Sequence, residues 1–175
     1  MNYTDLLKAR IAASYGSAFG LMDLVKDDEL NWKPHSGDNW MTVGQLLHHL
    51  TDACGACFKG FHTGDWGLPE GVSMEDMPAE ELMPPAEKMP AVESVAQARE
   101  MLRADKVLAL EMIAEAGEEN LEKRMVAPPW EPAHKAPLGN HFLGMVEHLE
   151  SHKSQLYYYL KLMGKPVNTS NLWGM

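Results

Sequence analysis

Residues 140–164, NHFLGMVEHLESHKSQLYYYLKLMG, decide the fold, because their apolar side chains recur at intervals of three and four positions. This spacing is typical of an amphipathic helix whose apolar face packs into a core. His148 and His152 are four residues apart, so their Cβ atoms are expected to lie about 5–6 Å from each other, one helical turn apart. Two imidazoles at this distance can bind one metal ion, and both border the inward face. The apolar positions are Phe142, Met145, Val146, Leu149, Leu156, Leu160 and Met163.

A third ligand is expected from the other histidines, and His49 is the strongest candidate. It lies on the apolar stripe of residues 46–50, LLHHL, whereas the side chain of His48 is turned about 100° away. A histidine on such a stripe is more often a hydrogen-bonded core residue than a ligand, and this alternative stays open for His49. The pair on residues 140–164 favours the ligand interpretation, since three histidines with an open position form the site that catalytic zinc uses. The remaining histidines are His35, His62, His134 and His141.

Three acidic or amide side chains near the histidine pair have different expected roles. Glu147 and Gln155 can each accept a hydrogen bond from a ligand imidazole, with a solvated surface role as the alternative. Glu150 lies about 200° around the helix from His148, because the order is HLESH. The zincin motif HExxH, which uses its glutamate as a general base, is therefore not present.

Helical periodicity also covers residues 4–25, 40–61 and 94–116, with Gly117 as the expected stop of the third helix. Residues 119–136 then form a proline-rich connection to the helix over 140–164. Four helices without a convincing strand predict an all-α fold, a four-helix bundle with a long crossover between helices 2 and 3. The length of 175 residues fits one domain over residues 1–175.

The long crossover, residues 62–92, is acidic and rich in proline and glycine. Loops of this length are uncommon in a compact domain and are usually functional or disordered. Its apolar side chains, among them Trp66 and Leu82, are too many for a fully solvated linker, so we expect contact with the bundle. Two interpretations stay open: a lid over the histidines that selects the substrate, and an insertion that packs on the outside.

Cys54 and Cys57 form a CxxC pair about twelve residues into the expected second helix. The redox version of this motif places its first cysteine at a helix N-terminus, where the helix dipole lowers the thiol pKa. In the middle of a helix the two are expected to be inert, small core residues. The alternatives are a thiol near the metal and a redox pair.

Composition excludes several classes of function. The formal net charge of −10 argues against binding of nucleic acid, which needs clustered Lys and Arg. No apolar run reaches the roughly 20 residues of a membrane span, and residues 1–10 lack the layout of a secretion signal. We therefore expect no nucleic acid or membrane partner and a cytoplasmic location.

Two segments resemble the DinB-like (DinB/YfiT-like) superfamily of metal-binding four-helix bundles. Residues 29–50, ELNWKPHSGDNWMTVGQLLHHL, resemble the family's entry into its second helix. Residues 146–166, VEHLESHKSQLYYYLKLMGKP, resemble its H-x-x-x-H ending. The resemblance implies metal ligands at His49, His148 and His152, the same three residues that periodicity favours. Lys153-Ser154 replaces the family's frequent Arg-Gly and is expected to change the charge beside the site.

The resemblance also implies a function, which fold alone does not fix. Members of the family include S-transferases that use low-molecular-weight thiols, so a metal-dependent thiol S-transferase or hydrolase is expected, with Zn²⁺ or Ni²⁺ as the divalent metal ion. The alternatives are a non-catalytic metal-binding bundle with a structural or stress-response role, and a thiol redox protein. Family bundles commonly pair, and the aromatic residues 157–159 and Trp173 suggest surface for a homodimer.

Overall fold

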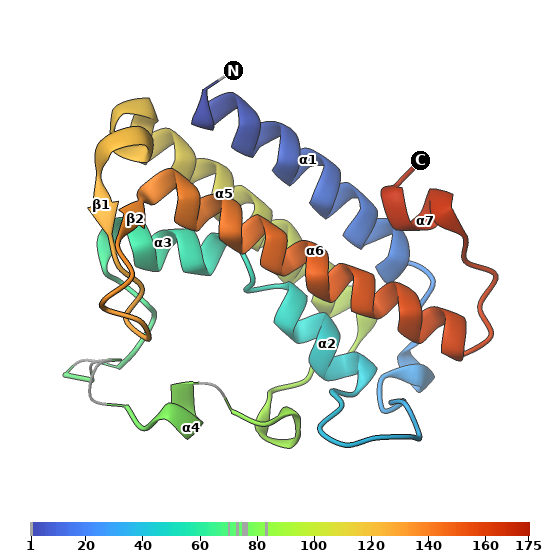
Figure 1. Cartoon of the computed structure of the whole chain (residues 1–175). Coiled ribbons are helices and arrows are strands. Elements are labelled where there is room, and N and C mark those ends of the chain that lie inside the picture. The colour runs from blue at the N-terminus through green and yellow to red at the C-terminus, as the bar shows by residue number, and fades with distance from the viewer. Residues whose placement is uncertain (1, 70, 73, 75–76, 83) are drawn as a thin grey trace.

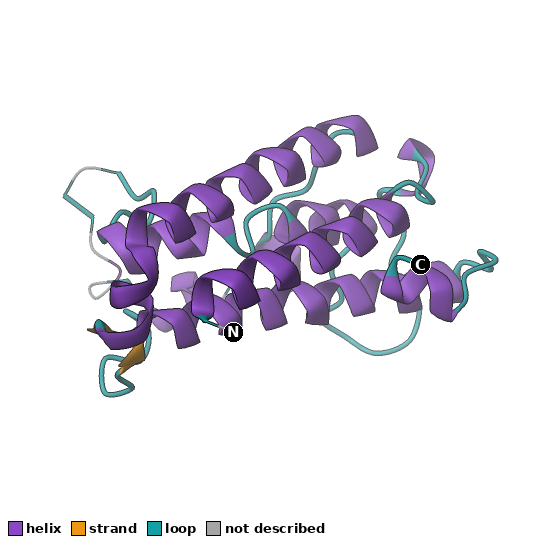
Figure 2. Ribbon diagram, turned by 90° about the horizontal axis from the view of Figure 1, so that it is seen from above, coloured by secondary structure: helices purple, strands orange, loops and turns teal. Residues whose placement is uncertain are grey.

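The computed structural model describes residues 2–69, 71–72, 74, 77–82 and 84–175, and the chain is mostly helical, as the sequence predicts (Figure 1). The long helices run along one direction in the view from above (Figure 2). The elements are α1 (Tyr3–Met22), α2 (Val43–Leu50), α3 (Gly55–Thr63), α4 (Ala79–Leu82), α5 (Val95–Lys123), β1 (Met125–Val126), β2 (Ala136–Pro137), α6 (Leu138–Leu162) and α7 (Thr169–Trp173). Short 3₁₀ turns cover Asp27–Glu29 and Ala86–Lys88. Among the residues so described, no helix is long and apolar enough to cross a membrane.

The core lies between α1, α3, α5 and α6. α1 and α3 both pack against α5 and α6, and α2 packs against α6. The apolar stripe that the sequence predicts on α6 is buried at Phe142, Leu149 and Leu156, whose side chains are fully inaccessible to solvent. Burial of this stripe sets the rotation of α6 about its own axis, and with it the direction in which His148 and His152 point.

The single helix expected over residues 40–61 is two helices, α2 and α3, which is a correction to the sequence prediction. α2 begins at a capping box between Thr42 and Gln45 and ends at Leu50. α3 begins at Gly55 because the Asp105 carboxylate on α5 accepts a hydrogen bond from the backbone N–H of Ala56 at 3.0 Å. A Cβ at position 55 would lie 2.3 Å from the backbone oxygen of Asp105, so only glycine permits this approach.

The third expected helix, 94–116, is longer than the sequence predicts. Gly117 has a φ of 67° and breaks the helical geometry, but α5 resumes beyond it as far as Lys123. The proline-rich connection expected over 119–136 is correspondingly shorter and contains a strand pair that was not expected, β1 with β2, in which Met125 opposes Pro137. This pair holds the start of α6 close to the end of α5.

The C-terminal helix α7, also not expected, is attached to α6 through Lys153. The buried Nζ of Lys153 donates hydrogen bonds to Glu150 Oε2 at 2.6 Å and to the backbone oxygen of Leu172 at 2.9 Å. Lys153 therefore binds α7 instead of changing the charge beside the histidines, and the sequence interpretation of this residue was wrong.

The three consecutive tyrosines of α6 differ in exposure. Tyr157 and Tyr159 are buried, whereas Tyr158 is 62% exposed.

Candidate metal centre

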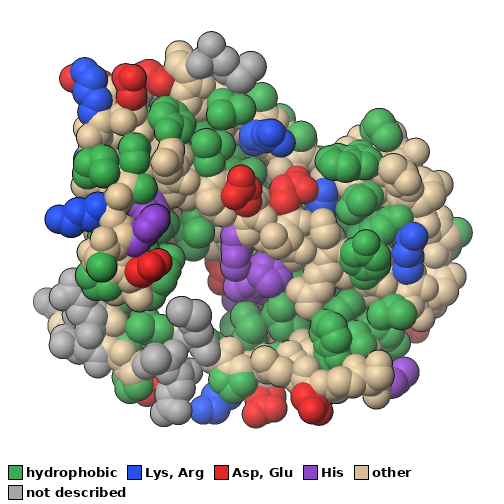
Figure 3. Space-filling view, viewed as in Figure 1, with side chains coloured by type: hydrophobic (Ala, Val, Ile, Leu, Met, Phe, Trp, Pro, Cys, Tyr) green, Lys and Arg blue, Asp and Glu red, His purple; other side chains and the backbone are tan. Residues whose placement is uncertain are grey.

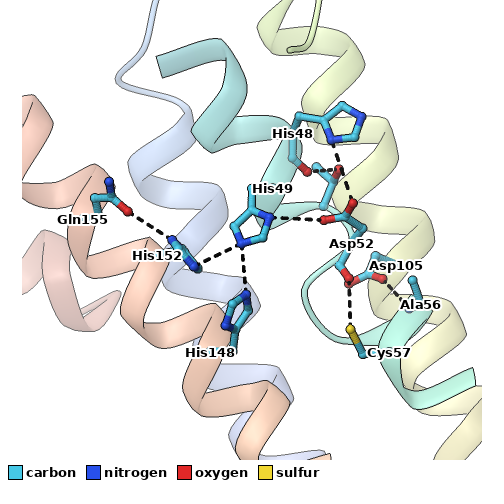
Figure 4. Close-up of polar contacts among 10 residues, drawn as sticks. His48, His49, Asp52, Ala56, Cys57, Asp105, His148, His152 and Gln155 are labelled. Atoms are coloured by element: carbon cyan, nitrogen blue, oxygen red, sulfur yellow. Dashed lines mark hydrogen bonds and ion pairs between the residues drawn. The ribbon is translucent and has the colours of Figure 1, made fainter. Parts of the chain in front are cut away.

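His49, His148 and His152 meet in one cluster between α2 and α6 (Figure 4). His49 Nε2 lies 3.0 Å from His148 Nε2 and 3.1 Å from His152 Nε2. One nitrogen of each ring falls within 4.8 Å of the other two. The last turn of α2 supplies His49, and consecutive turns of α6 supply the pair.

These nitrogens have the spacing that a cation requires. Ligand nitrogens at 2.0–2.1 Å from a tetrahedral zinc ion lie about 3.3 Å from each other, close to the two distances observed. Hydrogen bonding alone does not account for the cluster, because one ring nitrogen carries at most one hydrogen while His49 Nε2 contacts two other ring nitrogens. The donor set therefore fits a divalent metal ion.

A chain of hydrogen bonds fixes the tautomer of His152. The Tyr159 hydroxyl donates to the backbone oxygen of Met41 at 3.1 Å, so it can only accept from the Gln155 amide nitrogen, also at 3.1 Å. The Gln155 oxygen then faces His152 Nδ1 at 3.0 Å and accepts its hydrogen (Figure 4). The lone pair of His152 Nε2 consequently points at the other two histidines, as a metal ligand requires.

Of the two side chains that the sequence proposed as hydrogen-bond partners of a ligand, Gln155 takes this role. Glu147 is exposed, and its side chain makes no hydrogen bond to a ligand imidazole among the residues described. Gln155 succeeds because it lies three residues beyond His152 on the same face of α6.

All three imidazoles are neutral near pH 7. Burial lowers the pKa of His49 to about 4, and the neighbouring rings of His152 and His148 add to this shift. Burial and the ring of His152 likewise lower the pKa of His148 to about 4, and burial lowers that of His152. Neutral imidazole is the form that binds metal ions, so the site is ready to bind without losing protons first.

The other histidines lie outside this cluster. His48 Nδ1 is 3.9 Å from Asp52 Oδ2, with its ring turned away as the sequence predicts. His62 Nδ1 contacts the Arg124 guanidinium at 3.2 Å, and His141 Nε2 contacts the backbone oxygen of Val126 at 2.9 Å. Both are held by protein groups, which is the ordinary structural role of a histidine.

Comparison with known families agrees with this geometry. A family model described as the DinB superfamily matches residues 11–156, a range that contains all three clustered histidines and runs from α1 into α6. The chain belongs to the DinB superfamily. No protein with a curated description matches the sequence. Membership in this superfamily and the histidine cluster together fit a metal-binding site.

A cavity of about 540 Å³ opens onto the histidines of this DinB superfamily member. In the space-filling view the largest group of histidine side chains borders a hollow in the surface (Figure 3). Four segments build the wall: the stretch from Met41 through α2 and α3, the crossover, the connection before α6, and α6 itself. The lining residues are Met41, His49, Cys57, Leu82, Pro84, Met89, Trp130, Met145, His148 and His152.

Asp52 stands next to the cluster on the other side of His49. Its Oδ1 is 3.9 Å from His49 Nδ1, beyond hydrogen-bonding distance. Burial, and then repulsion from the Asp105 carboxylate, raise the pKa of Asp52 to about 7, although 49% of its side chain is exposed and water moderates this effect. The Asp52 carboxyl group therefore lies beside the site without being a ligand.

The sequence prediction for the place of the two cysteines within their helix was wrong. Cys54 is the N-cap of α3 and Cys57 lies in its first turn, so the pair is at a helix N-terminus and not in the middle of a helix. Burial nevertheless raises the pKa of both thiols, that of Cys57 to about 12. Cys54 is fully buried, and its Sγ donates to the backbone oxygen of Met145 at 3.3 Å. Burial outweighs the helix dipole, and neither thiol is acidified as redox chemistry requires.

Sequence reasoning missed the buried pair that places α3. Asp105 accepts hydrogen bonds from the Tyr15 hydroxyl and from the N-terminus of α3, and both side chains are buried. The signal was available, since Asp105 falls on the apolar stripe of its helix, three residues after Leu102 and four before Ala109. Trp130, which lines the cavity, lies in a connection whose path carries no such signal.

Proposed function

We propose that this protein binds one divalent metal ion, Zn²⁺ or Ni²⁺, through His49, His148 and His152, and uses it in thiol S-transfer or a hydrolytic reaction. The observation that carries this proposal is the convergence of three imidazole Nε2 atoms in the wall of an open cavity. Neutral imidazoles suit both metals, and a site with three protein ligands keeps a position for substrate or water. An ion held there supplies Lewis acidity, which lowers the pKa of a thiol or water beside it.

The residues of the chain contribute orientation and exclusion of water. The Gln155 oxygen keeps the His152 hydrogen on Nδ1, so that Nε2 stays a ligand. The wall around the histidines, which includes Met145 and Trp130, shields the reacting group of a bound thiol from solvent. In the transfer the thiol sulfur forms a bond to an electrophilic carbon, the leaving group departs with its bonding electron pair, and the thiol proton passes to solvent.

The alternative is a non-catalytic site with a structural or stress-response role, in which the ion only joins α2 to α6. The cavity favours the first function, because structural zinc sites are closed by four protein ligands. A thiol redox function has less support, since burial raises the pKa of both cysteines.

We also propose that residues 62–92 act as a lid, although residues 70, 73, 75–76 and 83 of this segment lie outside the part that the structure describes. Leu82, Pro84 and Met89 line the histidine cavity, and the segment that carries α4 passes below α2 and α3 in Figure 1. Gln45 anchors its end by donating from Nε2 to the backbone oxygens of Ala86 and Met89, at 2.7 and 2.8 Å.

The arrangement of helices is part of the same proposal. We take α1, the broken segment α2–α3, α5 and α6 as the four members of a bundle, with the lid as its long crossover, in one domain over residues 1–175. The cytoplasmic location and the homodimer expected from the sequence remain predictions.

Turnover with and without metal tests the function. Protein loaded with Zn²⁺ or Ni²⁺ is assayed with a panel of thiols and one electrophilic acceptor, beside the metal-free protein and His148→Ala. We expect metal-dependent transfer that His148→Ala abolishes, and a sharp change in turnover, with metal binding intact, when residues 67–88 are replaced by a short linker. Equal turnover with and without metal contradicts the catalytic proposal. Unchanged turnover after shortening leaves the loop only a packing role.

A further inference from the structure

The wall of the histidine cavity is almost entirely apolar. Apart from the three histidines, its lining among the described residues consists of hydrophobic side chains and one thiol, that of Cys57. The hydrophobic members are Met41, Leu82, Pro84, Met89, Trp130 and Met145. No Lys, Arg, Ser, Thr, Asn or Gln stands among these lining residues. Beyond the histidines, the hydrogen-bond donors among these described lining residues are the indole N–H of Trp130 and the weakly donating thiol of Cys57, and no lining side chain carries a positive charge to pair with a carboxylate.

Two cations of the described chain, Arg124 and Lys153, are engaged in other contacts. The Arg124 guanidinium donates to the backbone oxygens of Phe61 and His62 at the end of α3, at 3.0 and 2.7 Å. Lys153 is buried against α7, where it pairs with Glu150. The whole chain has a formal net charge of −10. This net charge opposes an anionic ligand.

We propose that the cavity takes a thiol with an uncharged, apolar body. The inference rests on the proposed function, because the thiol must reach the three histidines. A carboxylate inside such a wall would lose its hydration without a cation to pair with, whereas an aromatic or aliphatic body exchanges water for contact with methionine, leucine and tryptophan. The volume of about 540 Å³ is within the range of small-molecule sites.

Three of the wall residues are methionines. We therefore expect the cavity to select ligands by their charge more than by their shape. Met41, Met89 and Met145 have flexible, polarizable side chains that adapt to differently shaped partners. We therefore expect aromatic and straight-chain thiols of similar size to bind alike, and a carboxylate on either to weaken binding at least tenfold.

A matched pair of thiols tests the inference on the full-length protein loaded with Co²⁺. Phenylmethanethiol and its 4-carboxylate are titrated separately, with sulfur-to-cobalt charge-transfer absorption and calorimetry as readouts. We expect the dissociation constant of the carboxylate to be at least tenfold higher. In Met89→Lys, a cation in the wall should reduce that ratio at least tenfold, and the anchor of the loop persists because Gln45 bonds the backbone oxygen of residue 89. The control is Met125→Lys, on a strand residue that is 56% exposed and does not line the cavity.

The outcomes separate this inference from the proposed function. Cobalt uptake with charge-transfer bands and the expected affinity ratio supports both. If both thiols give charge-transfer bands but the carboxylate binds as tightly as phenylmethanethiol, the function stands and the inference is wrong. If no cobalt is taken up, or if neither thiol produces a charge-transfer band, the proposed function falls and the inference falls with it.

Discussion

Replacing Gln155 by leucine should weaken metal binding about tenfold or more without unfolding the protein. The Gln155 oxygen is the acceptor for His152 Nδ1 at 3.0 Å, and leucine provides none. Loss of such a partner behind a metal ligand typically costs 10–100-fold in metal affinity, which is about 1.4–2.7 kcal/mol. His152 is half-buried, so water can replace part of the lost bond, and we expect the lower end of this range.

The assay is a competition titration of zinc against a chromophoric chelator at pH 7, with circular dichroism to verify the fold. Tyr159→Phe is a second, milder perturbation, because it removes only the hydroxyl that orients the Gln155 amide. Its loss of affinity should be smaller than that of Gln155→Leu. The matched control is Glu147→Leu, an exposed residue on the same helix, which should bind zinc like the wild type. If Gln155→Leu binds zinc as tightly as Glu147→Leu, the argument from the fixed tautomer is refuted.

Three further predictions concern pH, the thiols and assembly. Metal affinity should fall only at lower pH than for a site of ordinary histidines, because burial lowers the pKa values of His49 and His148 to about 4 and also lowers that of His152; a loss of affinity that sets in near pH 6.5, as for unperturbed imidazoles, contradicts this. Cys57 should react slowly with iodoacetamide at pH 7 and quickly after unfolding, since burial raises its pKa to about 12; rapid modification of the native protein would show an acidified thiol. Light scattering at micromolar concentration should give the mass of a homodimer, and a monomer mass refutes the pairing expected from exposed aromatic rings such as Tyr158.

The histidine pair could be predicted from the sequence because it depends only on local features, the spacing of the two residues and the apolar stripe of their own helix. The apolar stripe on α6 is continuous, so the direction of His148 and His152 follows from helical spacing alone. His49 required a second stripe, which is intact over α2. The sequence narrowed the hydrogen-bond partner of a ligand imidazole to two candidates, Gln155 and Glu147. The structure distinguishes them, because Gln155 contacts His152 Nδ1 and is oriented by Tyr159, whereas Glu147 is exposed.

The break between α2 and α3 could not be predicted from the sequence, because its cause lies far away along the chain. The apolar periodicity continues across residues 51–54, and local propensity gives no strong stop. A carboxylate on α5, Asp105, caps the N-terminus of α3 and so restarts the helix. The same limit applies to the cavity wall: Leu82 and Trp130 reach the histidines along irregular chain paths that no periodicity encodes.

The metal content of the protein is the most direct test of the three-histidine site. Protein purified without a histidine tag is measured by elemental analysis beside four variants, His49→Ala, His148→Ala, His152→Ala and His48→Ala. We expect about one divalent ion per chain in the wild type and in His48→Ala, because the His48 ring points away from the cluster, and none in the other three variants. Full metal occupancy in His49→Ala, or none in the wild type after incubation with Zn²⁺ and Ni²⁺, contradicts the three-histidine site.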